Sequence, residues 1–348
     1  MAKIFTGMVV ALVLVGGCGK ESPDAAVEAG RAAPPSGPLV VYASHDAART
    51  ASVLDAYRKD TGTKFRLLSD DMPEQAARLD NPQLMPKADL FIAGSLAEIW
   101  NVAESDALRP TNSDVVSGNI APEMRDPESR WFALASRARI VVYNVGMVSE
   151  ERMSGLQNYA ALGDEAWRDS LCVASSAVPG NRALIAFLIK RLGVREAEIV
   201  VRRWRENLAA TVFVNDEELL QAVSDGQCAM GIADSNVLAE LNGARPNSPV
   251  AAHWFDSSAE TFFDISGAGV TRHAANPEGA VALLEWLTTD VPNALFAIND
   301  FEFPVNSEAP MGAAIEDWSG RVRQPDSLAE LGFLLEESAQ LVKRARYP

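Results

Sequence analysis

The sequence predicts an α/β protein whose folded body has two lobes. Short apolar runs typical of strands alternate with segments of about 10–15 residues that have helical periodicity, a pattern that favours a largely parallel sheet covered by helices. Two long strand-like segments, 132–144 and 261–270, separate two blocks of this alternation. The chain has 348 residues, of which 48% are hydrophobic, enough apolar content for two lobes of ordinary size. The long segments are therefore expected to cross between the lobes as hinge strands.

The first 38 residues are expected to lie outside this body. An apolar run from Ile4 to Val15 is too short to span a bilayer as a helix but suits the core of a signal peptide, here residues 1–17. Residues 15–18, VGGC, resemble the lipobox of bacterial lipoproteins, in which the cysteine carries acyl chains after cleavage. The alternative is an ordinary secretory signal with an accidental cysteine. The sequence thus predicts a bacterial lipoprotein in the periplasm, anchored to a membrane only through Cys18, with residues 18–38 as a flexible tether.

The first block of the body begins with a continuous apolar strand at 39–43 and a helix at 48–61. Further strands are expected at 65–68 and 88–93, followed by a helix over 95–105 that ends before Pro110. The second block has expected strands at 172–174, 211–213 and 229–233, and expected helices at 182–193, 196–208 and 217–225. A last helix is expected at 277–288, after the second long strand.

Charge and cysteine usage exclude some classes of partner. The formal net charge of −16, with no offsetting run of Lys or Arg, argues against nucleic acid. With Cys18 lipidated, Cys172 and Cys228 are left as the even pair expected in an oxidising compartment. Both lie in strand-like segments, so neighbouring strands could bring them within bonding distance, and a disulfide is expected. Two separate buried thiols are the alternative.

Motifs for catalysis are missing from the sequence. It contains no G-x-S-x-G, no H-E-x-x-H and no P-loop, and His45, His253 and His273 lack the spacing of metal ligands. We therefore expect a protein that is not an enzyme and that carries no cofactor and no metal centre. An exported enzyme on the same fold would have only His45, Asp46 and Asp234 as candidate catalytic groups.

Candidate ligand-binding residues follow the predicted strands. In open α/β sheets, ligands bind beyond the carboxyl ends of strands, where helix N-termini offer N–H donors. The residues at these positions are Ser44, His45, Asp46, Gly94, Ser95, Ser175, Ser176, Asn181, Asp234, Ser235 and Asn236. For each segment, helix capping alone is the alternative role, because Ser, Asp and Asn are favoured as caps. Four such segments in two lobes predict a cleft lined by both.

Several long stretches resemble the periplasmic substrate-binding proteins of ABC transporters, in particular their ferric-ion-binding branch within extracellular solute-binding family 1. They are VVYASHDAARTASVLDAYRKDTGTKF, ADLFIAGSLAEIWNVAESDAL, WFALASRARIVVYN, LCVASSAVPGNRALIAFLI, FFDISGAGVTRHAANPEGAVALLEWL and NDFEFPVN. Both internal cysteines also stand where many relatives have them.

The resemblance implies a two-lobed periplasmic-binding-protein (type II) fold with mixed sheets flanked by helices. Lobe 1 would comprise residues 39–131 and 265–305, and lobe 2 residues 132–264 and 306–348. Hinge positions would be Arg137, Arg139, Ser266 and Gly267. It further implies a monomer that closes over one small-molecule ligand and delivers it to an inner-membrane transporter permease.

The iron ligands of the ferric branch are replaced in this chain. The branch holds ferric ion with two adjacent tyrosines, matched here by Asn236 and Val237, with a histidine matched by Asp46, and in several members with a glutamate matched by Gly94. Because ferric ion prefers several anionic oxygen ligands, the sequence predicts an organic or oxyanion-bearing solute rather than bare ferric ion. The alternatives are a bulky neutral or lipid-like ligand of about sterol size, ferric ion with unusual ligands, and a sensor or scaffold lipoprotein.

Overall fold

The computed structural model describes residues 37–44, 47–69, 87–322 and 327–347. Residues 37–348 form one compact unit, which contains every element described below. The predicted signal peptide and Cys18 lie outside the described residues, as do His45 and Asp46.

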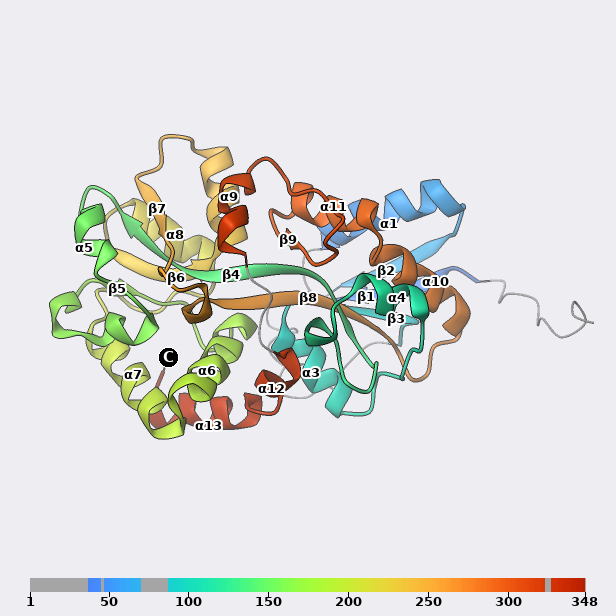
Figure 1. Ribbon diagram of the computed structural model, residues 1–348, viewed down its shortest axis with the longest axis horizontal. Coiled ribbons are helices and arrows are strands. Elements are labelled where there is room, and N and C mark those ends of the chain that lie inside the picture. Colours follow the sequence, from blue (N-terminus) through green and yellow to red (C-terminus); the bar gives the residue numbers. More distant parts are fainter. Residues whose placement is uncertain (1–36, 45–46, 70–86, 323–326, 348) are drawn as a thin grey trace, which may run out of the picture. The chain divides into compact units, whose positions relative to one another are not determined.

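A single mixed sheet organises the described chain (Figure 1), in the order β2-β1-β3-β8-β4-β6-β5, with β7 and β9 also paired to β4. The strands are β1 Leu39–Ala43, β2 Phe65–Ser69, β3 Leu90–Ala93, β4 Phe132–Asn144, β5 Leu171–Cys172, β6 Met230–Asp234, β7 Val250–His253, β8 Phe262–Val270 and β9 Phe303–Pro304. We call the part built on β1, β2 and β3 the β1 half, and the part built on β5, β6 and β7 the β6 half. The long strands β4 and β8 run through both.

Helices flank the long strands on either side. The α-helices are α1 Ala47–Thr61, α3 Leu96–Glu104, α4 Asp114–Asn119, α5 Glu150–Ser154, α6 Pro179–Leu192, α7 Val194–Glu206, α8 Asp216–Ser224, α9 Ser235–Ala244, α10 Pro277–Leu287, α11 Asp290–Asn299, α12 Leu328–Gly332 and α13 Leu335–Ala345. In Figure 1, α1, α9 and α11 lie above β4 and β8, and α3, α6, α12 and α13 lie below them. No single helix among the described residues is both long enough and apolar enough to cross a membrane. The pair α10–α11 meets the two criteria only when its helices are counted together, and it is bent by 69° between them.

Strand β4 is buried along its whole length because it lies between β8 and β6 with helices on both faces. Its alternate residues therefore enter different cores. Ala138, Ile140 and Val142 pack in the core with α8 and α9, whereas Val141 and Tyr143 belong to the larger core that includes α6 and α7. The same alternation places Arg137 and Arg139 on one face of β4, where they shape the candidate site.

The predicted disulfide is present in the structure. Cys172 at the end of β5 is bonded to Cys228, which precedes β6, with the two Cα atoms 5.9 Å apart. Strands β5 and β6 are parallel neighbours, with Cys172 opposite Gly231. The adjacent strands therefore place the two cysteines within bonding distance, as the sequence led us to expect.

Most predicted elements are confirmed, including 39–43 and 132–144 at their predicted bounds. The expected strand at 211–213 is wrong, because only a single bridge from Phe213 to Ala174 forms there. The expectation of a largely parallel sheet is also wrong, because every pair that involves β4 or β8 is antiparallel. The two blocks share one mixed sheet, since β4 and β8 pair from Phe132 to Arg139. The predicted residue ranges of the lobes stay predictions.

The C-terminal helices connect the two halves. Helix α13 packs on α6 and α7 of the β6 half, and α12 packs on α3 of the β1 half. Gly332 at the end of α12 lies directly on the Trp100 ring of α3, so that a Cβ atom there would stand 2.1 Å from Trp100 Cε3. Only glycine permits this approach.

Replacing Gly332 with alanine should therefore destabilise the protein by about 1–3 kcal/mol, because the buried Trp100 ring cannot move away without disturbing the core. The measurement is the free energy of unfolding in urea. Gly243→Ala is the matched control, since nothing lies within 4 Å of a Cβ atom at that helical position. Equal stability of the two variants would contradict the packing of α12 on α3.

Candidate functional site

Two buried arginines lie at the point where the β1 half meets the β6 half. Arg137 and Arg139 are two residues apart on β4, so both side chains leave the strand on the same face. Arg139 is fully buried and Arg137 is 7% exposed. Because a buried guanidinium must be hydrogen-bonded and neutralised, the surrounding elements are arranged to supply oxygen atoms.

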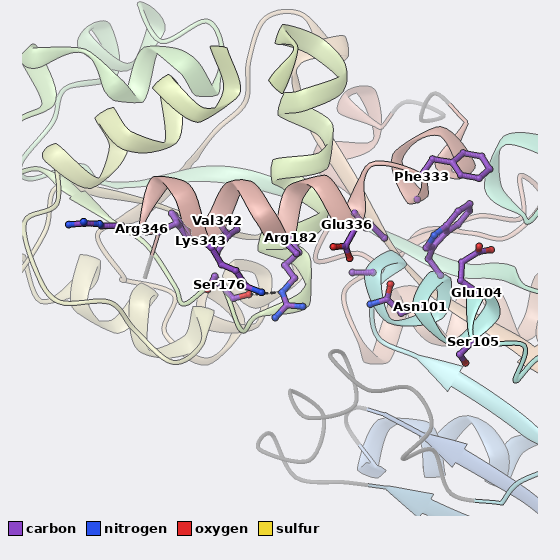
Figure 2. Close-up of a pocket in the computed structure, with 16 residues that line it drawn as sticks. Asn101, Glu104, Ser105, Ser176, Arg182, Phe333, Glu336, Val342, Lys343 and Arg346 are labelled. Carbon is purple, nitrogen blue, oxygen red and sulfur yellow. Dashed lines mark hydrogen bonds between the residues drawn. The ribbon is translucent and has the colours of Figure 1, made fainter. Parts of the chain in front are cut away.

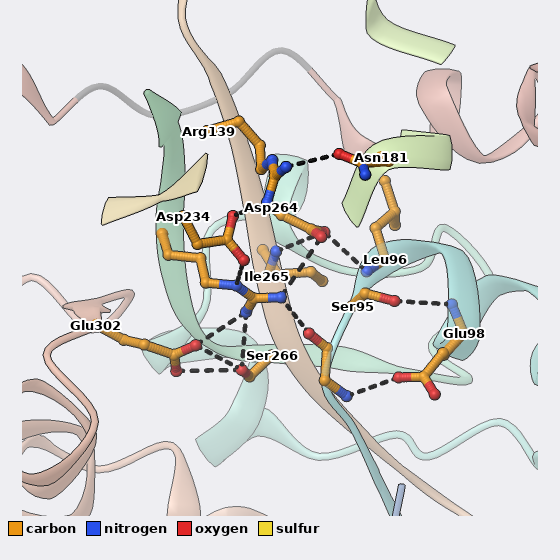
Figure 3. A network of polar contacts seen from close by, with 12 residues as sticks. Ser95, Leu96, Glu98, Arg139, Asn181, Asp234, Asp264, Ile265, Ser266 and Glu302 are labelled. Carbon is orange, nitrogen blue, oxygen red and sulfur yellow. Dashed lines mark hydrogen bonds and ion pairs between the residues drawn. The ribbon is translucent and has the colours of Figure 1, made fainter. Parts of the chain in front are cut away.

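Arg137 joins the start of α3 to the start of α9, and Figure 3 shows its partners Asp234, Ser266 and Glu302. Its Nη2 donates to the Gly94 carbonyl before α3, and its Nε lies 2.8 Å from Asp234 Oδ2 before α9. Its Nη1 lies 2.9 Å from Glu302 Oε1 and 3.3 Å from Ser266 Oγ. One side chain thus fixes the turn between β3 and α3 and the junction of β6 with α9.

Arg139 joins the starts of three helices in the β6 half. Its Nη2 donates to Asn181 Oδ1 in the first turn of α6, at 2.6 Å. Its Nη1 pairs with Asp216 at the start of α8 and lies 3.1 Å from Asp234 Oδ1. Gly180 permits the close approach of α6, because a Cβ atom there would stand 3.2 Å from Asp264 Oδ2. The two arginines therefore gather the N-terminal ends of α3, α6, α8 and α9.

The arginine pair is surrounded by an excess of acidic side chains. The buried carboxyl groups in this network are Glu98, Asp216, Asp234, Asp264 and Glu302, against two guanidinium groups. Burial raises the pKa of Asp216 and of Asp264, with Arg139 and Arg137, respectively, opposing the rise. Burial would also raise the pKa of Asp234, but the two guanidinium groups hold it below its usual value. Carboxyl groups thus outnumber guanidinium groups in the network, and the two arginines favour the ionised form of Asp234.

Glu98 is a site residue that the sequence analysis missed. Its Oε2 accepts hydrogen bonds from Ser44 Oγ at 3.0 Å and from the Gly94 backbone N–H at 3.0 Å. Burial raises its pKa to about 7, because the two hydrogen bonds and the more distant Arg137 only partly offset the desolvation of the charged form. The carboxyl group therefore lies beside Gly94 although it comes from one turn further into α3.

Several predicted ligand-binding residues are engaged within the protein. Ser95 caps α3 by accepting from Glu98 N, and Ser235 accepts from Ala138 N. Asn181 donates to the carbonyls of Ala174 and Ser175 while it accepts from Arg139. Ser44, Gly94 and Asp234 are buried in the same network. These residues position the helix ends, and capping explains Ser95 fully.

Three predicted residues have side-chain polar atoms that the arginine network does not use. Asn236, in the first turn of α9, is 8% exposed, and its Oδ1 accepts no hydrogen bond from the described residues. Ser175 and Ser176 are half-buried in the loop before α6. His45 and Asp46 lie outside the described residues, and in the described ranges no group of three His, Cys, Asp or Glu side chains could hold a metal ion.

The sequence analysis overlooked a pattern in β4 that indicates acidic partners for its arginines. Arg137 and Arg139 stand in an otherwise apolar strand, which required buried carboxylates somewhere in the fold. Asp216, Asp264 and Glu302 meet that requirement. Their sequence separations from the arginines are long, so the requirement could not say which carboxylates would be used.

Comparison with known proteins agrees with this architecture. The sequence profile of the family described as bacterial extracellular solute-binding protein matches residues 52–321. Iron uptake protein A1 of Synechocystis sp. is 26% identical over 345 residues, covering 97% of this chain and 94% of that protein. The Fe(3+)-binding periplasmic protein of Serratia marcescens is 21% identical over 271 residues, covering 77% and 78% of the two chains.

Solved structures show the same fold. A Trichodesmium protein in complex with iron and citrate ligands superposes with a TM-score of 0.79 at 26% identity, covering 90% of this chain and all of that one (100%). The ferric binding protein from Campylobacter jejuni gives a TM-score of 0.81 at 19% identity, covering 89% and 100% of the two chains. The predicted two-lobed fold is confirmed at this level.

The raised pKa of Glu98 predicts a specific pH dependence of stability. A carboxyl group whose pKa is raised from 4.5 to about 7 on folding binds more protons in the folded state, so its contribution to stability is lost as pH rises through that window. Glu98→Gln keeps an acceptor for Ser44 and Gly94 but removes the titration. Relative to the wild type, the variant should gain about 2 to 3 kcal/mol of unfolding free energy between pH 5 and pH 8.

Urea unfolding at closely spaced pH values measures this difference. Glu123→Gln, which removes an exposed carboxylate, is the control for the loss of one charge. Parallel pH profiles for the wild type and Glu98→Gln would show that Glu98 does not titrate in this window.

Proposed function

Because this chain belongs to the bacterial extracellular solute-binding protein family, we propose that it is a receptor of the ferric-binding type, which captures one solute between the β1 half and the β6 half and delivers it to a membrane permease. The observation that carries the proposal is the convergence of the starts of α3, α6, α8 and α9 on Arg137 and Arg139. Helix N-termini gathered from both halves provide N–H groups and small polar side chains around one location. A change in the angle between the halves would assemble or separate that site.

We propose ferric iron as the metal that the receptor carries. The names of the Synechocystis and Serratia relatives refer to iron, and the Trichodesmium structure contains iron. The acidic excess around the two arginines also favours a cation over a free anion. These observations favour iron over the free organic solute that the sequence led us to expect, and the charged surroundings disfavour a neutral, lipid-like ligand.

The iron needs oxygen ligands from outside the protein. Asn236 and Val237 stand where the ferric branch has paired tyrosines, and neither provides an anionic oxygen. At this helix start the protein offers Asn236 Oδ1, a neutral oxygen without a hydrogen-bond partner among the described residues. Because ferric ion prefers several anionic oxygen ligands, we propose that it arrives with a chelating organic anion that supplies the rest. The complex of the Trichodesmium protein with iron and citrate supports this form of cargo.

The cellular setting follows from the same comparisons. The Serratia relative is a periplasmic protein by name, and we place this receptor in the periplasm as well. Lipidation of Cys18 and delivery to an inner-membrane permease stay predictions. Nothing in the described part of the site argues for turnover of the solute.

Restoring paired tyrosines should convert the site to direct ferric binding. We expect the double variant Asn236→Tyr with Val237→Tyr to bind ferric ion without a chelator at least about tenfold more tightly than the wild type. The variant should also gain the visible absorption of a ferric–tyrosinate complex, which the wild type should lack. Titration with ferric salt, followed by absorption and by iron analysis after desalting, measures both effects.

The matched control is Asn236→Phe with Val237→Phe, which adds the same rings without hydroxyl groups. For the wild type, native mass spectrometry after incubation with ferric citrate should show one iron together with citrate on each chain. Failure of the wild type to retain iron with citrate would refute the proposed cargo. A tyrosinate band in the wild type would refute the proposed ligand set.

A further inference from the structure

The last turn of α13 is fastened to α7 by two arginines. Arg202 Nη2 donates to the Arg344 carbonyl at 2.6 Å, and Arg205 Nη1 donates to the Ala345 carbonyl at 3.3 Å. The last carbonyl groups of a helix have no partner within the helix, so the two guanidinium groups satisfy acceptors that the helix leaves open. The end of α13 is thereby held against the β6 half.

The residue after α13 turns the chain inward. Arg346 adopts the left-handed conformation, with φ 53° and ψ 41°, and the N–H of Tyr347 donates to the Val342 carbonyl at 3.0 Å. This conformation often ends a helix, but it costs free energy at a residue that has a Cβ atom. A favourable contact of the following residue must offset that cost. Tyr347 makes such a contact, since its side chain returns to the interior and is only 7% exposed.

The Tyr347 hydroxyl contacts a backbone carbonyl beside the arginine network. It donates to the Ala174 carbonyl at 3.1 Å, and the same carbonyl accepts from Asn181 Nδ2 at 3.0 Å. Asn181 in turn accepts from Arg139 through its Oδ1. Burial raises the pKa of Tyr347 above its usual value, although Arg139 opposes the rise, so the hydroxyl keeps its proton and remains a donor. Tyr347 and Asn181 thus hold the same carbonyl group.

Ala174 leads into the segment that carries two predicted ligand-binding residues, Ser175 and Ser176. Strand β5 ends at Cys172, and beyond it an isolated bridge from Ala174 to Phe213 replaces the continuous pairing of a strand. Side-chain bonds to the Ala174 carbonyl therefore contribute more to fixing this segment than they would within a sheet. Figure 2 shows Ser176 beside α13, and Tyr347 lines the same crevice.

We infer that Tyr347 is a positioning residue of the solute site, which holds Ser175 and Ser176 in place through the Ala174 carbonyl. The inference rests on the proposed function, because it assigns these two serines to the bound solute. Tyr347 itself does not contact the solute, since its hydroxyl is already used. It acts on a residue 173 positions earlier in the sequence, so only the fold brings the two together.

The test is Tyr347→Phe in the full chain, which keeps the ring and removes only the hydroxyl. Ferric citrate should bind about fivefold more weakly, the effect of about one lost hydrogen bond, because the serines are no longer held in place. Exchange of the Ser175 and Val178 amide hydrogens should become about fivefold faster for the same reason. Calorimetric titration measures the affinity, and mass spectrometry of peptides that cover 173–181 measures the exchange.

Tyr57→Phe is the matched control, because it removes the hydroxyl of a comparably buried tyrosine on α1, 5% exposed, in the β1 half. Each variant loses one buried hydroxyl, so their free energies of unfolding in urea should fall by similar amounts. Only Tyr347→Phe should change ferric citrate binding and the exchange at Ser175 and Val178. A role of Tyr347 in stability alone would lower the free energy of unfolding and leave both of these readouts unchanged.

Two results would overturn the inference: equal ferric citrate affinity of Tyr347→Phe and the wild type, or unchanged exchange at Ser175 and Val178. If the wild type binds no ferric citrate, the proposed cargo fails and the exchange rates decide the inference by themselves. Faster exchange at these amides in Tyr347→Phe, and not in Tyr57→Phe, then supports it, and equal rates overturn it.

Discussion

The need to neutralise Arg137 and Arg139 inside the protein organises the structure around the site. A guanidinium taken out of water loses several kcal/mol of hydration, which only close oxygen partners can offset. Arg137 and Arg139 are two residues apart on β4, so both guanidinium groups leave the strand on the same face. The partners come from the loop before α3 and from the starts of α6, α8 and α9. The ends of four helices, which would otherwise be independent, are thereby fixed relative to one strand.

This arrangement explains why small polar residues at helix starts have more than one role. Asn181 could cap its helix or bind a ligand, but the structure uses its amide oxygen for Arg139 and its amide N–H groups for Ala174 and Ser175. Asp234 stands at the N-cap position of α9 without capping it, because its carboxylate is held by the two arginines. Such residues belong to the proposed ligand site because they fix the positions of the helix ends that surround it. Only a change in the network could move them.

Local patterns were sufficient to predict most of the fold. The apolar runs at 39–43 and 132–144 and the alternating elements around them gave the strands and helices, since burial on both faces leaves a continuous apolar segment. Strand direction could not be obtained in this way, because a long strand shared by two halves reads the same whether its neighbours run parallel or antiparallel. The strand predicted at 211–213 was wrong because a short β-branched run satisfies the strand pattern even where only one bridge forms.

In the site, Glu98 was missed because its carboxyl group folds back one helical turn to Gly94, a contact that depends on the side chain's direction and not on its position in the sequence.

The charge distribution explains why the absence of paired tyrosines does not by itself decide the ligand. Ferric ion requires anionic oxygen, but the requirement can be met by the protein, by a bound anion, or by both. In this chain the protein's own carboxylates near the helix ends are largely committed to the arginines, and Glu98 is held partly protonated near neutral pH by burial. Any hard cation that enters must therefore bring ligands of its own or displace a carboxylate from an arginine, and the second route would leave a buried guanidinium without a partner. A cargo in which an organic anion already covers the metal avoids that cost. The same physical constraint that fixes the helix ends thus favours the form in which iron can be carried.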